Sequence, residues 1–219
     1  MPTYDIGDMP AQISPEVIAL LEQTETATIG HWRHWGFCDR RIQPALRGHR
    51  IAGTAVTLAI PGPDCTLLHH ALGLLRPGDI LLVDRLGDDR HACWGGGVTA
   101  AAQAAGAKAG VVDGPCTDLE EIEAAAFPIW CRGFAPITAN LYDLGGRLNR
   151  PVCIGGAVVM PGDAVLCDDS GVLVLSPTEA EAEARQAIVQ QASGLETQRR
   201  VAQGAKLGDL SGATARVLK

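Results

Sequence analysis

Aromatic side chains are scarce in this sequence, at 4% of the 219 residues, whereas Ala, Gly, Val and Leu are abundant. Small and branched apolar residues suit close packing of helices on a sheet. Hydrophobic residues make up 47% of the chain and charged residues 20%, so a chain of this length can bury a full core. Wholesale disorder is therefore excluded.

Positive charge is also sparse. The 18 Lys and Arg are outnumbered by 25 Asp and Glu, which gives a net charge of −7. The densest basic groups are only pairs, Arg40–Arg41 and Arg199–Arg200. Because phosphate contacts need clustered cations, we expect no nucleic-acid partner.

Long apolar runs and paired-cysteine motifs are missing. No stretch of 18 apolar residues occurs, and the N-terminal MPTYDIGDMP lacks the basic and apolar regions of a secretory signal, so no membrane association is expected. The seven cysteines are widely spaced and include no C-x-x-C, which argues against a zinc knuckle or a thioredoxin-like site. We expect a soluble, cytoplasmic protein with reduced thiols.

Strand-like and helix-like segments alternate through the first two thirds of the chain, which indicates an α/β fold. Apolar, β-branched runs predict strands at 51–60, 80–84, 109–113 and 128–131. Helices are predicted at 14–21, 26–35, 65–75, 98–105 and 117–126.

The pattern changes after residue 150. Short apolar segments at 152–154, 157–159, 164–166 and 172–175 are separated by glycine-containing turns and predict a β meander on the same core. A long Ala/Glu/Gln helix follows, and its polar character suggests a surface or a subunit contact. We therefore predict a single domain over 1–219, with N-terminal helices at about 14–36, a core at about 50–176 and a C-terminal helix at about 177–204.

The most informative stretch is a glycine-rich turn, Gly95-Gly96-Gly97, that opens a helix at Val98. Free N–H groups at such a helix start favour an anion. One strand later, Asp118 supplies a carboxylate that could hold a divalent cation. Together these features suit chemistry on a small carboxylic acid, provided that the fold brings them together. The alternative is that the glycines serve close packing and that Asp118 is an ordinary helix cap.

Histidines offer further candidates. His31 and His34 are spaced to share one helix face, whereas His69 and His70 cannot both face the same way. Such residues could bind a metal or move protons, but histidines beside tryptophans more often cap or pack.

Ten ordered motifs resemble the RraA-like family. They are Gly53–Thr57 (GTAVT), Pro77–Asp79 (PGD), Val83–Asp84, Gly95, Gly110–Gly114 (GVVDG), Asp118, Arg132–Gly133, Gly155–Gly156, Pro161–Asp163 (PGD) and Asp169–Val172 (DSGV). The family includes 4-hydroxy-4-methyl-2-oxoglutarate and 4-carboxy-4-hydroxy-2-oxoadipate aldolases and the RraA regulators of ribonuclease E. The resemblance spans roughly residues 15 to 210. It implies a swivelling β/β/α core in homotrimers or homohexamers, with sites at subunit boundaries.

The resemblance also implies the parts of a site. Asp118 would help to hold Mg²⁺ or Mn²⁺ through a largely water-filled shell, and the amides near Gly97 and Val98 would complete a cradle for the substrate. An acid in the C-terminal helix of a neighbouring subunit, here Glu196, would add to the site.

The chain departs from the family at two positions, since Thr117 stands where the aldolases have an arginine and Gly96 where they have an acid. Loss of a bidentate guanidinium contact is expected to cost about 1.5–3 kcal/mol of substrate binding. Loss of its charge is expected to cost about 10²–10³ in rate. These departures predict that any lyase activity differs from standard pyruvate-releasing aldolase chemistry.

Two readings remain open. The first is a divergent carbon–carbon lyase, of aldolase or decarboxylase type, that acts on a small 2-oxo acid with Mg²⁺ or Mn²⁺. Its expected catalytic residues are Asp118, Glu196, His91 and Thr117, and its expected substrate contacts are Gly95, Gly96, Gly97, Val98 and Thr117. Arg85 or Arg90 could supply the positive charge of the arginine that is missing at position 117.

The second reading is a non-catalytic regulator that binds a protein such as ribonuclease E. A methyltransferase is not expected, because no glycine-rich nucleotide loop is followed by an acid at Rossmann spacing.

Overall fold

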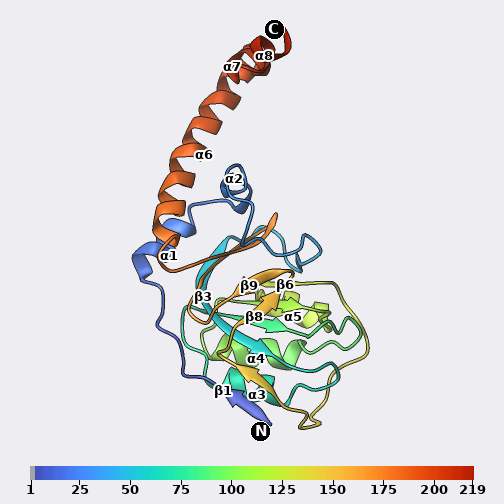
Figure 1. The fold of residues 1–219 in the computed structure, drawn as a ribbon. Helices are drawn as coiled ribbons and strands as arrows, with labels where there is room; N and C mark the ends of the chain where they lie inside the picture. Colours follow the sequence, from blue (N-terminus) through green and yellow to red (C-terminus); the bar gives the residue numbers. More distant parts are fainter. Residues whose placement is uncertain (1–2) are drawn as a thin grey trace.

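A computed structural model describes residues 3–219. The strands of its main sheet are β1 (Tyr4–Ile6), β2 (Gln43–Pro44), β3 (Ile51–Ala59), β4 (Asp79–Asp84), β5 (Ala109–Asp113), β6 (Ile129–Cys131), β7 (Gly146–Leu148), β10 (Ala164–Asp168) and β11 (Gly171–Leu175). Within the described residues they form one nine-stranded mixed sheet, in the order β1-β7-β3-β4-β5-β6-β2, with β10 paired to β3 and β11 paired to β10. Figure 1 shows this sheet at the centre of the body.

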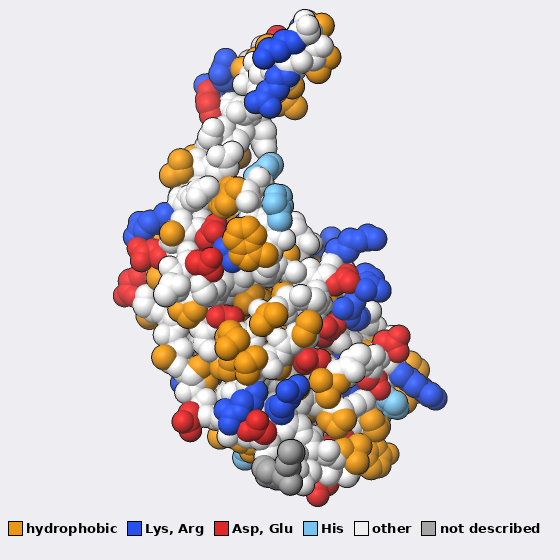
Figure 2. Space-filling view, viewed as in Figure 1, with side chains coloured by type: hydrophobic (Ala, Val, Ile, Leu, Met, Phe, Trp, Pro, Cys, Tyr) orange, Lys and Arg blue, Asp and Glu red, His pale blue; other side chains and the backbone are white. Residues whose placement is uncertain are grey.

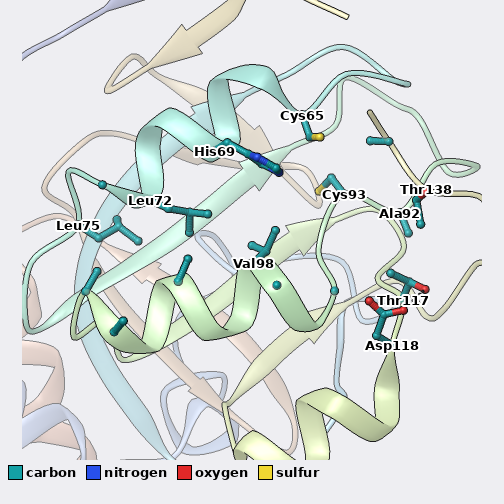
Figure 3. A pocket seen from close by; sticks show the side chains of 17 residues that line it. Cys65, His69, Leu72, Leu75, Ala92, Cys93, Val98, Thr117, Asp118 and Thr138 are labelled. Carbon is teal, nitrogen blue, oxygen red and sulfur yellow. Dashed lines mark hydrogen bonds between the residues drawn. The ribbon is translucent and has the colours of Figure 1, made fainter. Parts of the chain in front are cut away.

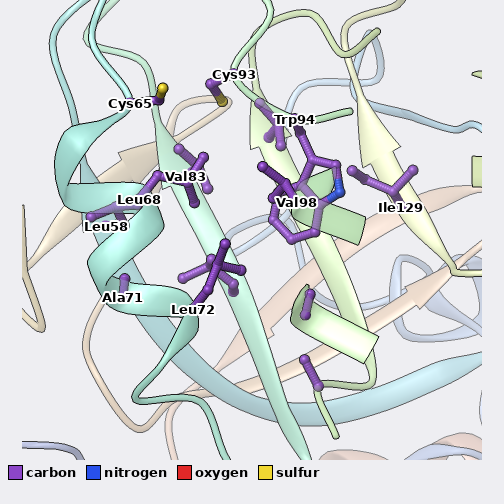
Figure 4. Packing of buried hydrophobic residues seen from close by; sticks show 14 of the residues in the cluster. Leu58, Cys65, Leu68, Ala71, Leu72, Val83, Cys93, Trp94, Val98 and Ile129 are labelled. Atoms are coloured by element: carbon purple, nitrogen blue, oxygen red, sulfur yellow. The ribbon is translucent and has the colours of Figure 1, made fainter. Parts of the chain in front are cut away.

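The four strands β3 to β6 run parallel, which confirms the predicted alternation of strand and helix. The connecting helices are α3 (Thr66–Leu72), α4 (Gly96–Ala104) and α5 (Leu119–Ala125). They pack on one face of the sheet, where α3 and α4 bury leucine, valine and alanine side chains against β3 and β4 (Figure 4). Helix α4 begins at Gly96, earlier than predicted, whereas α3 and α5 are shorter than predicted.

Trp94 holds the glycine-rich turn in place from the side of the hydrophobic core. Its side chain is fully buried in the layer between helices and sheet (Figure 4). The indole covers Gly110, where an added Cβ would lie 2.7 Å from the ring, and it stacks on Phe127 with 6.1 Å between ring centroids. The indole Nε1 donates to Thr99 Oγ1 at 3.0 Å. Because the residue before Gly95 is held in this way, the turn itself has a fixed position.

The opposite face of the sheet carries a hairpin over residues 152–159, which packs against β3 and β4. Within residues 3–219, strands β8 (Val152–Ile154) and β9 (Ala157–Val159) pair only with each other, whereas β10 runs antiparallel to β3 and extends the main sheet. The prediction that these four strands form one continuous β meander is therefore wrong, because they form two separate pairs, β8–β9 and β10–β11. The left-handed Gly155 and Gly156 close the β8–β9 hairpin, and the Pro161–Asp163 turn then leads the chain back to β3.

The N-terminal region is less helical than predicted. Helix α1 (Pro15–Leu21) begins after the Ser14 cap as expected, but α2 spans only Thr26–Ile29. The predicted helix over 26–35 is wrong beyond Gly30, because the chain turns there and the Arg33 side chain points inward. Strands β1 and β7 were not predicted.

Helix α6 (Ala180–Ala202) forms an arm. Its first turns are buried through Ala180, Ala184 and Ala187, and the rest projects from the body with α7 (Leu207–Leu210) and α8 (Ala213–Val217) at the far end (Figure 1). Figure 2 shows hydrophobic and basic side chains gathered at the tip. In the described part of the chain, α6 included, no helix combines the length and apolar composition that a membrane crossing requires.

Arg33 fastens the arm to the body. Its side chain is 4% exposed, and its guanidinium donates to Glu183 at 2.9 Å and to Glu179 at 3.3 Å and lies 4.6 Å from the centre of the Trp35 ring. Replacing Arg33 with methionine is expected to lower the free energy of unfolding by about 1.5–3 kcal/mol and to speed amide exchange at the start of α6, because charged hydrogen bonds are lost. Urea denaturation and hydrogen exchange would measure both effects.

The matched control is Arg185→Met, which breaks the exposed Arg185–Glu181 pair on the same helix. That change is expected to cost no more than about 0.5 kcal/mol. Equal effects of the two substitutions would contradict the anchoring role of Arg33.

Candidate functional site

The head of α4 presents unpaired backbone donors. Gly95 is the N-cap in an extended conformation and, having no side chain, does not cap the helix itself. The Gly96 N–H is taken by Asp118, whereas among residues 3–219 no acceptor is present for the N–H groups of Gly97 and Val98. Two N–H groups at the positive end of a nine-residue helix are therefore available to an anion.

Asp118 faces this helix start. Its Oδ2 accepts the Gly96 N–H at 3.1 Å, and its Oδ1 accepts the Thr117 hydroxyl at 3.0 Å. Asp118 precedes α5 but does not cap it with its side chain, and its backbone is left-handed, with φ 54°. The alternative that Asp118 is an ordinary helix cap is therefore wrong. The predicted proximity of Asp118 to the amides after Gly95 is confirmed.

Two carboxylates lie directly over two of the glycines. A Cβ added at Gly95 would be 2.2 Å from Asp118 Oδ2, and one added at Gly96 would be 1.6 Å from Glu121 Oε2. Any side chain at either position would displace a carboxylate. Glu121 was not predicted from the sequence; it lies in the first turn of α5, and the fold brings its carboxylate to Gly96.

A cavity of about 860 Å³ runs from Gly95 and Asp118 along the groove between α3 and α4 (Figure 3). Asp118, Thr117 and the first turn of α4 line one end, and leucine and alanine side chains line the rest. This arrangement of a few polar groups at one end of an apolar groove is typical of small-molecule sites.

Three other side chains in the cavity bear on its chemistry. His69 reaches it from α3, and Cys65 and Cys93 form part of its wall (Figure 3). Burial raises the pKa of the Cys93 thiol to about 11 and raises that of Cys65 as well. Both thiols are therefore protonated near neutral pH, which argues against thiolate nucleophiles here.

The donor set fits a hard divalent cation. Asp118 supplies carboxylate oxygens at one end of the cavity, and Mg²⁺ is typically held by one or two carboxylates with water in its remaining positions. Among residues 3–219 no group of three or more His, Cys, Asp or Glu side chains is placed to hold a metal. Water or substrate would therefore complete the coordination.

Other candidates lie outside the cavity lining. His91 Nδ1 pairs with Asp88 Oδ2 at 2.8 Å in the loop before the glycine-rich turn. Arg85 is fully buried behind the cavity wall, where one nitrogen donates to the carbonyl oxygens of Gly62 and His91, while its Nε and Nη1 are buried without a partner in residues 3–219. Arg90 is exposed. Neither Arg85 nor Arg90 therefore replaces, in the cavity, the arginine that the family's aldolases have at position 117.

The remaining candidates are dispersed. His31, His34 and His70 are exposed and line no part of the cavity. Glu196 lies on the projecting part of α6, where hydrogen bonds from Arg199 lower its pKa. Within one chain, Glu196 does not line the cavity, so its predicted role would need a neighbouring subunit.

The fold and the site together define a mixed α/β protein with an anion cradle and a carboxylate pair at the head of one helix. Residues 22–174 match the RraA-like family described as Aldolase/RraA, and the chain belongs to that family.

Relatives with similar sequences support this assignment. The chain is 32% identical over 140 residues to a protein of Halalkalibacterium halodurans that is provisionally named a 4-hydroxy-4-methyl-2-oxoglutarate aldolase, covering 64% of this chain and 66% of the relative. It thus spans less than two thirds of that relative's length. A Burkholderia multivorans protein with the same provisional name is 34% identical over 139 residues, covering 62% and 84%.

Among solved structures, Streptomyces coelicolor RraAS2 is 25% identical, with a TM-score of 0.76 over 85% of this chain and 98% of that one. It is described as an unusual member of the RNase ES inhibitor RraA family. The mixed sheet described above is therefore an RraA-like fold.

Proposed function

We propose that this protein is a divalent-metal-dependent carbon–carbon lyase, of aldolase or decarboxylase type, that acts on a small 2-oxo acid. The observation that carries the proposal is the contact between Asp118 Oδ2 and the Gly96 N–H at 3.1 Å, beside two unpaired amides in the same cavity. Membership of a family that includes provisionally named aldolases supports it. The contact brings together a carboxylate suited to a cation and a helix start suited to an anionic substrate.

Each part of the site has a distinct role in this proposal. The N–H groups of Gly97 and Val98 bind the substrate carboxylate, and the Thr117 hydroxyl orients Asp118 through its 3.0 Å hydrogen bond. Asp118 would hold the cation, Mg²⁺ or Mn²⁺, which when bound would polarise the 2-oxo group. The apolar wall from α3 and α4 excludes water from the rest of the substrate.

The arm would provide the last residue of the site, Glu196. Val189 and Leu195 on α6 and Leu207 on α7 are 71%, 66% and 61% exposed, so these apolar side chains are available to pack on another chain. We propose that the arm packs on a second copy in a homotrimer or homohexamer and carries Glu196 toward the neighbour's cavity. Light scattering coupled to size-exclusion chromatography would measure the assembly.

The direct test is to titrate the purified protein with Mn²⁺ and to assay it with oxaloacetate. We expect Mn²⁺ to bind, oxaloacetate to lose CO₂ only when Mg²⁺ or Mn²⁺ is present, and chelation to stop the reaction reversibly. Spectrophotometric loss of oxaloacetate, corrected for metal alone, would measure the rate. Absence of metal binding by the wild-type protein would contradict the proposal.

A second candidate function is regulation by binding to ribonuclease E. The similarity to RraAS2 favours it, and so does the presence of Thr117 at the position where the family's aldolases have an arginine. In that case the protein would be captured by immobilised ribonuclease E and would lower its cleavage rate, whereas metal titration would give no signal. The two assays therefore separate a lyase from a regulator.

A further inference from the structure

We propose that the substrate is a 2-oxo acid with an apolar chain of several carbons and no second carboxylate. This inference rests on the proposed function, because it names the substrate class of the same site. The helix start at Gly97 and Val98 and the groove between α3 and α4 belong to one cavity of about 860 Å³. A molecule whose carboxylate lies at the helix start would therefore place the rest of its chain in the groove.

The floor of the groove is apolar along its length. Leu72 and Leu75 from α3 and Val98 from α4 are 6%, 7% and 9% exposed, and they point between the two helices (Figure 3). Leu75 lies at the end of the cavity opposite to Asp118 (Figure 3). From Val98 to Ala104 the helix covers about 9 Å at 1.5 Å per residue, which is enough for a chain of several carbons. Burial of such a chain against these side chains favours its binding.

Small residues on α4 keep the groove open. Gly97, Ala101 and Ala104 line the cavity, and their spacing places them on one face of the helix. A Cβ added at Gly97 would meet nothing within 4 Å. Because none of these side chains extends beyond a methyl group, the space between the two helices is left to a ligand.

No fixed positive charge is available for a second carboxylate. Among residues 3–219, the side chains that line the cavity include no Lys and no Arg, and His69 is the only one of them that can gain a positive charge by protonation. A carboxylate in an apolar groove without a cationic partner would lose its hydration without compensation. The proposed substrate therefore differs from 4-hydroxy-4-methyl-2-oxoglutarate, the dicarboxylate in the provisional names of the relatives.

An apolar segment of a neighbouring copy is the other occupant that would suit this groove. If it packed there, it would leave no room for a substrate chain. The affinity for 2-oxo acids would then not depend on their chain length, and a large residue placed in the groove would break up the assembly.

The experiment is calorimetry of 2-oxo acids with the full chain and Mg²⁺ at pH 8, where an ordinary imidazole is neutral. From pyruvate to 2-oxohexanoate, the affinity is expected to rise roughly fourfold for each added methylene. 2-Oxoadipate has the same six-carbon chain as 2-oxohexanoate but ends in a second carboxylate. It is expected to bind at least about tenfold more weakly than 2-oxohexanoate, because that charge finds no partner.

Two substitutions at Ala101 test whether the chain lies in the groove. Ala101 lines the cavity and is exposed, so a larger side chain enters the groove without disturbing the core. Ala101→Phe is expected to abolish the gain in affinity per methylene, and Ala101→Lys to strengthen 2-oxoadipate binding about tenfold by supplying a cation. The matched control is Ala100→Phe, at an exposed position outside the cavity lining, which is expected to keep the wild-type dependence on chain length.

The substrate class is overturned if 2-oxoadipate binds as tightly as 2-oxohexanoate, or if affinity does not rise with chain length. It is also overturned if Ala101→Phe breaks up the assembly in light scattering and leaves the dependence on chain length unaltered. The proposed function survives these outcomes if the protein binds Mn²⁺ and decarboxylates oxaloacetate, whose four carbons do not extend along the groove. A protein that shows the dependence on chain length but binds no metal would keep the ligand class and lose the lyase function.

Discussion

Asp118→Asn is expected to abolish measurable Mn²⁺ binding and to lower kcat/KM for oxaloacetate by about 10²–10³-fold, the usual effect of removing one preorganised electrostatic contact. The substitution removes the charge and keeps the shape. Asparagine also tolerates the left-handed conformation, φ 54°, that Asp118 adopts. Its amide oxygen can still accept the Gly96 N–H, so the turn is expected to remain in place.

Alanine would be a poorer probe of the same carboxylate. A residue with a Cβ and no polar group costs about 1–2 kcal/mol in the left-handed region, so Asp118→Ala would mix strain with lost chemistry. The control is Glu120→Gln, an exposed acid in the first turn of α5. Metal affinity, initial rates and thermal denaturation should be measured together. An Asp118→Asn protein with wild-type metal affinity would contradict the assignment.

Trp94→Ala is expected to lower the free energy of unfolding by about 3–5 kcal/mol, the range for removing a fully buried large aromatic ring. The loss leaves a void over Gly110, ends the stacking on Phe127 and leaves Thr99 without its indole donor. The Trp94 carbonyl also accepts the Thr117 N–H at 2.8 Å. We therefore expect the site to loosen along with the core, so that metal affinity falls too.

Urea denaturation at one fixed protein concentration would measure the stability loss, because association can add to apparent stability. Trp35→Ala is the matched control, since Trp35 is 61% exposed and contributes mainly its contact with the Arg33 guanidinium. Its cost is expected to be about 0.5–1 kcal/mol. A Trp94→Ala protein no less stable than the Trp35→Ala protein would show that Trp94 does not anchor the turn.

Much of the core could be predicted from the sequence because its signals are local. Apolar β-branched runs identified β3, β4, β5 and β6, and the glycine-rich turn identified the start of α4 to within two residues. The proximity of Asp118 to that turn was predictable because successive parallel strands lead their connections to the same edge of a sheet.

Features that depend on distant pairing could not be predicted. Strand β1 pairs with β7 across most of the chain, and each is only three residues long, too short for a periodic pattern. The early end of α2 depends on Arg33 reaching Glu179 and Glu183 on the arm. Glu121 was missed because glycine at position 96 was interpreted as the loss of an acid, whereas the space it leaves admits an acid from another helix.

The reach of α6 has a genetic consequence under the proposed assembly. If the arm of one subunit completes the cavity of its neighbour, a substitution at Glu196 would impair the neighbour's cavity. The cavity of the substituted subunit itself would stay intact, provided that its own neighbour carries an unchanged arm. Mixed rings of two individually inactive chains, one damaged in the arm and one at Asp118, would then contain some intact sites. Such complementation between alleles would make phenotypes depend on which damaged copies are expressed together.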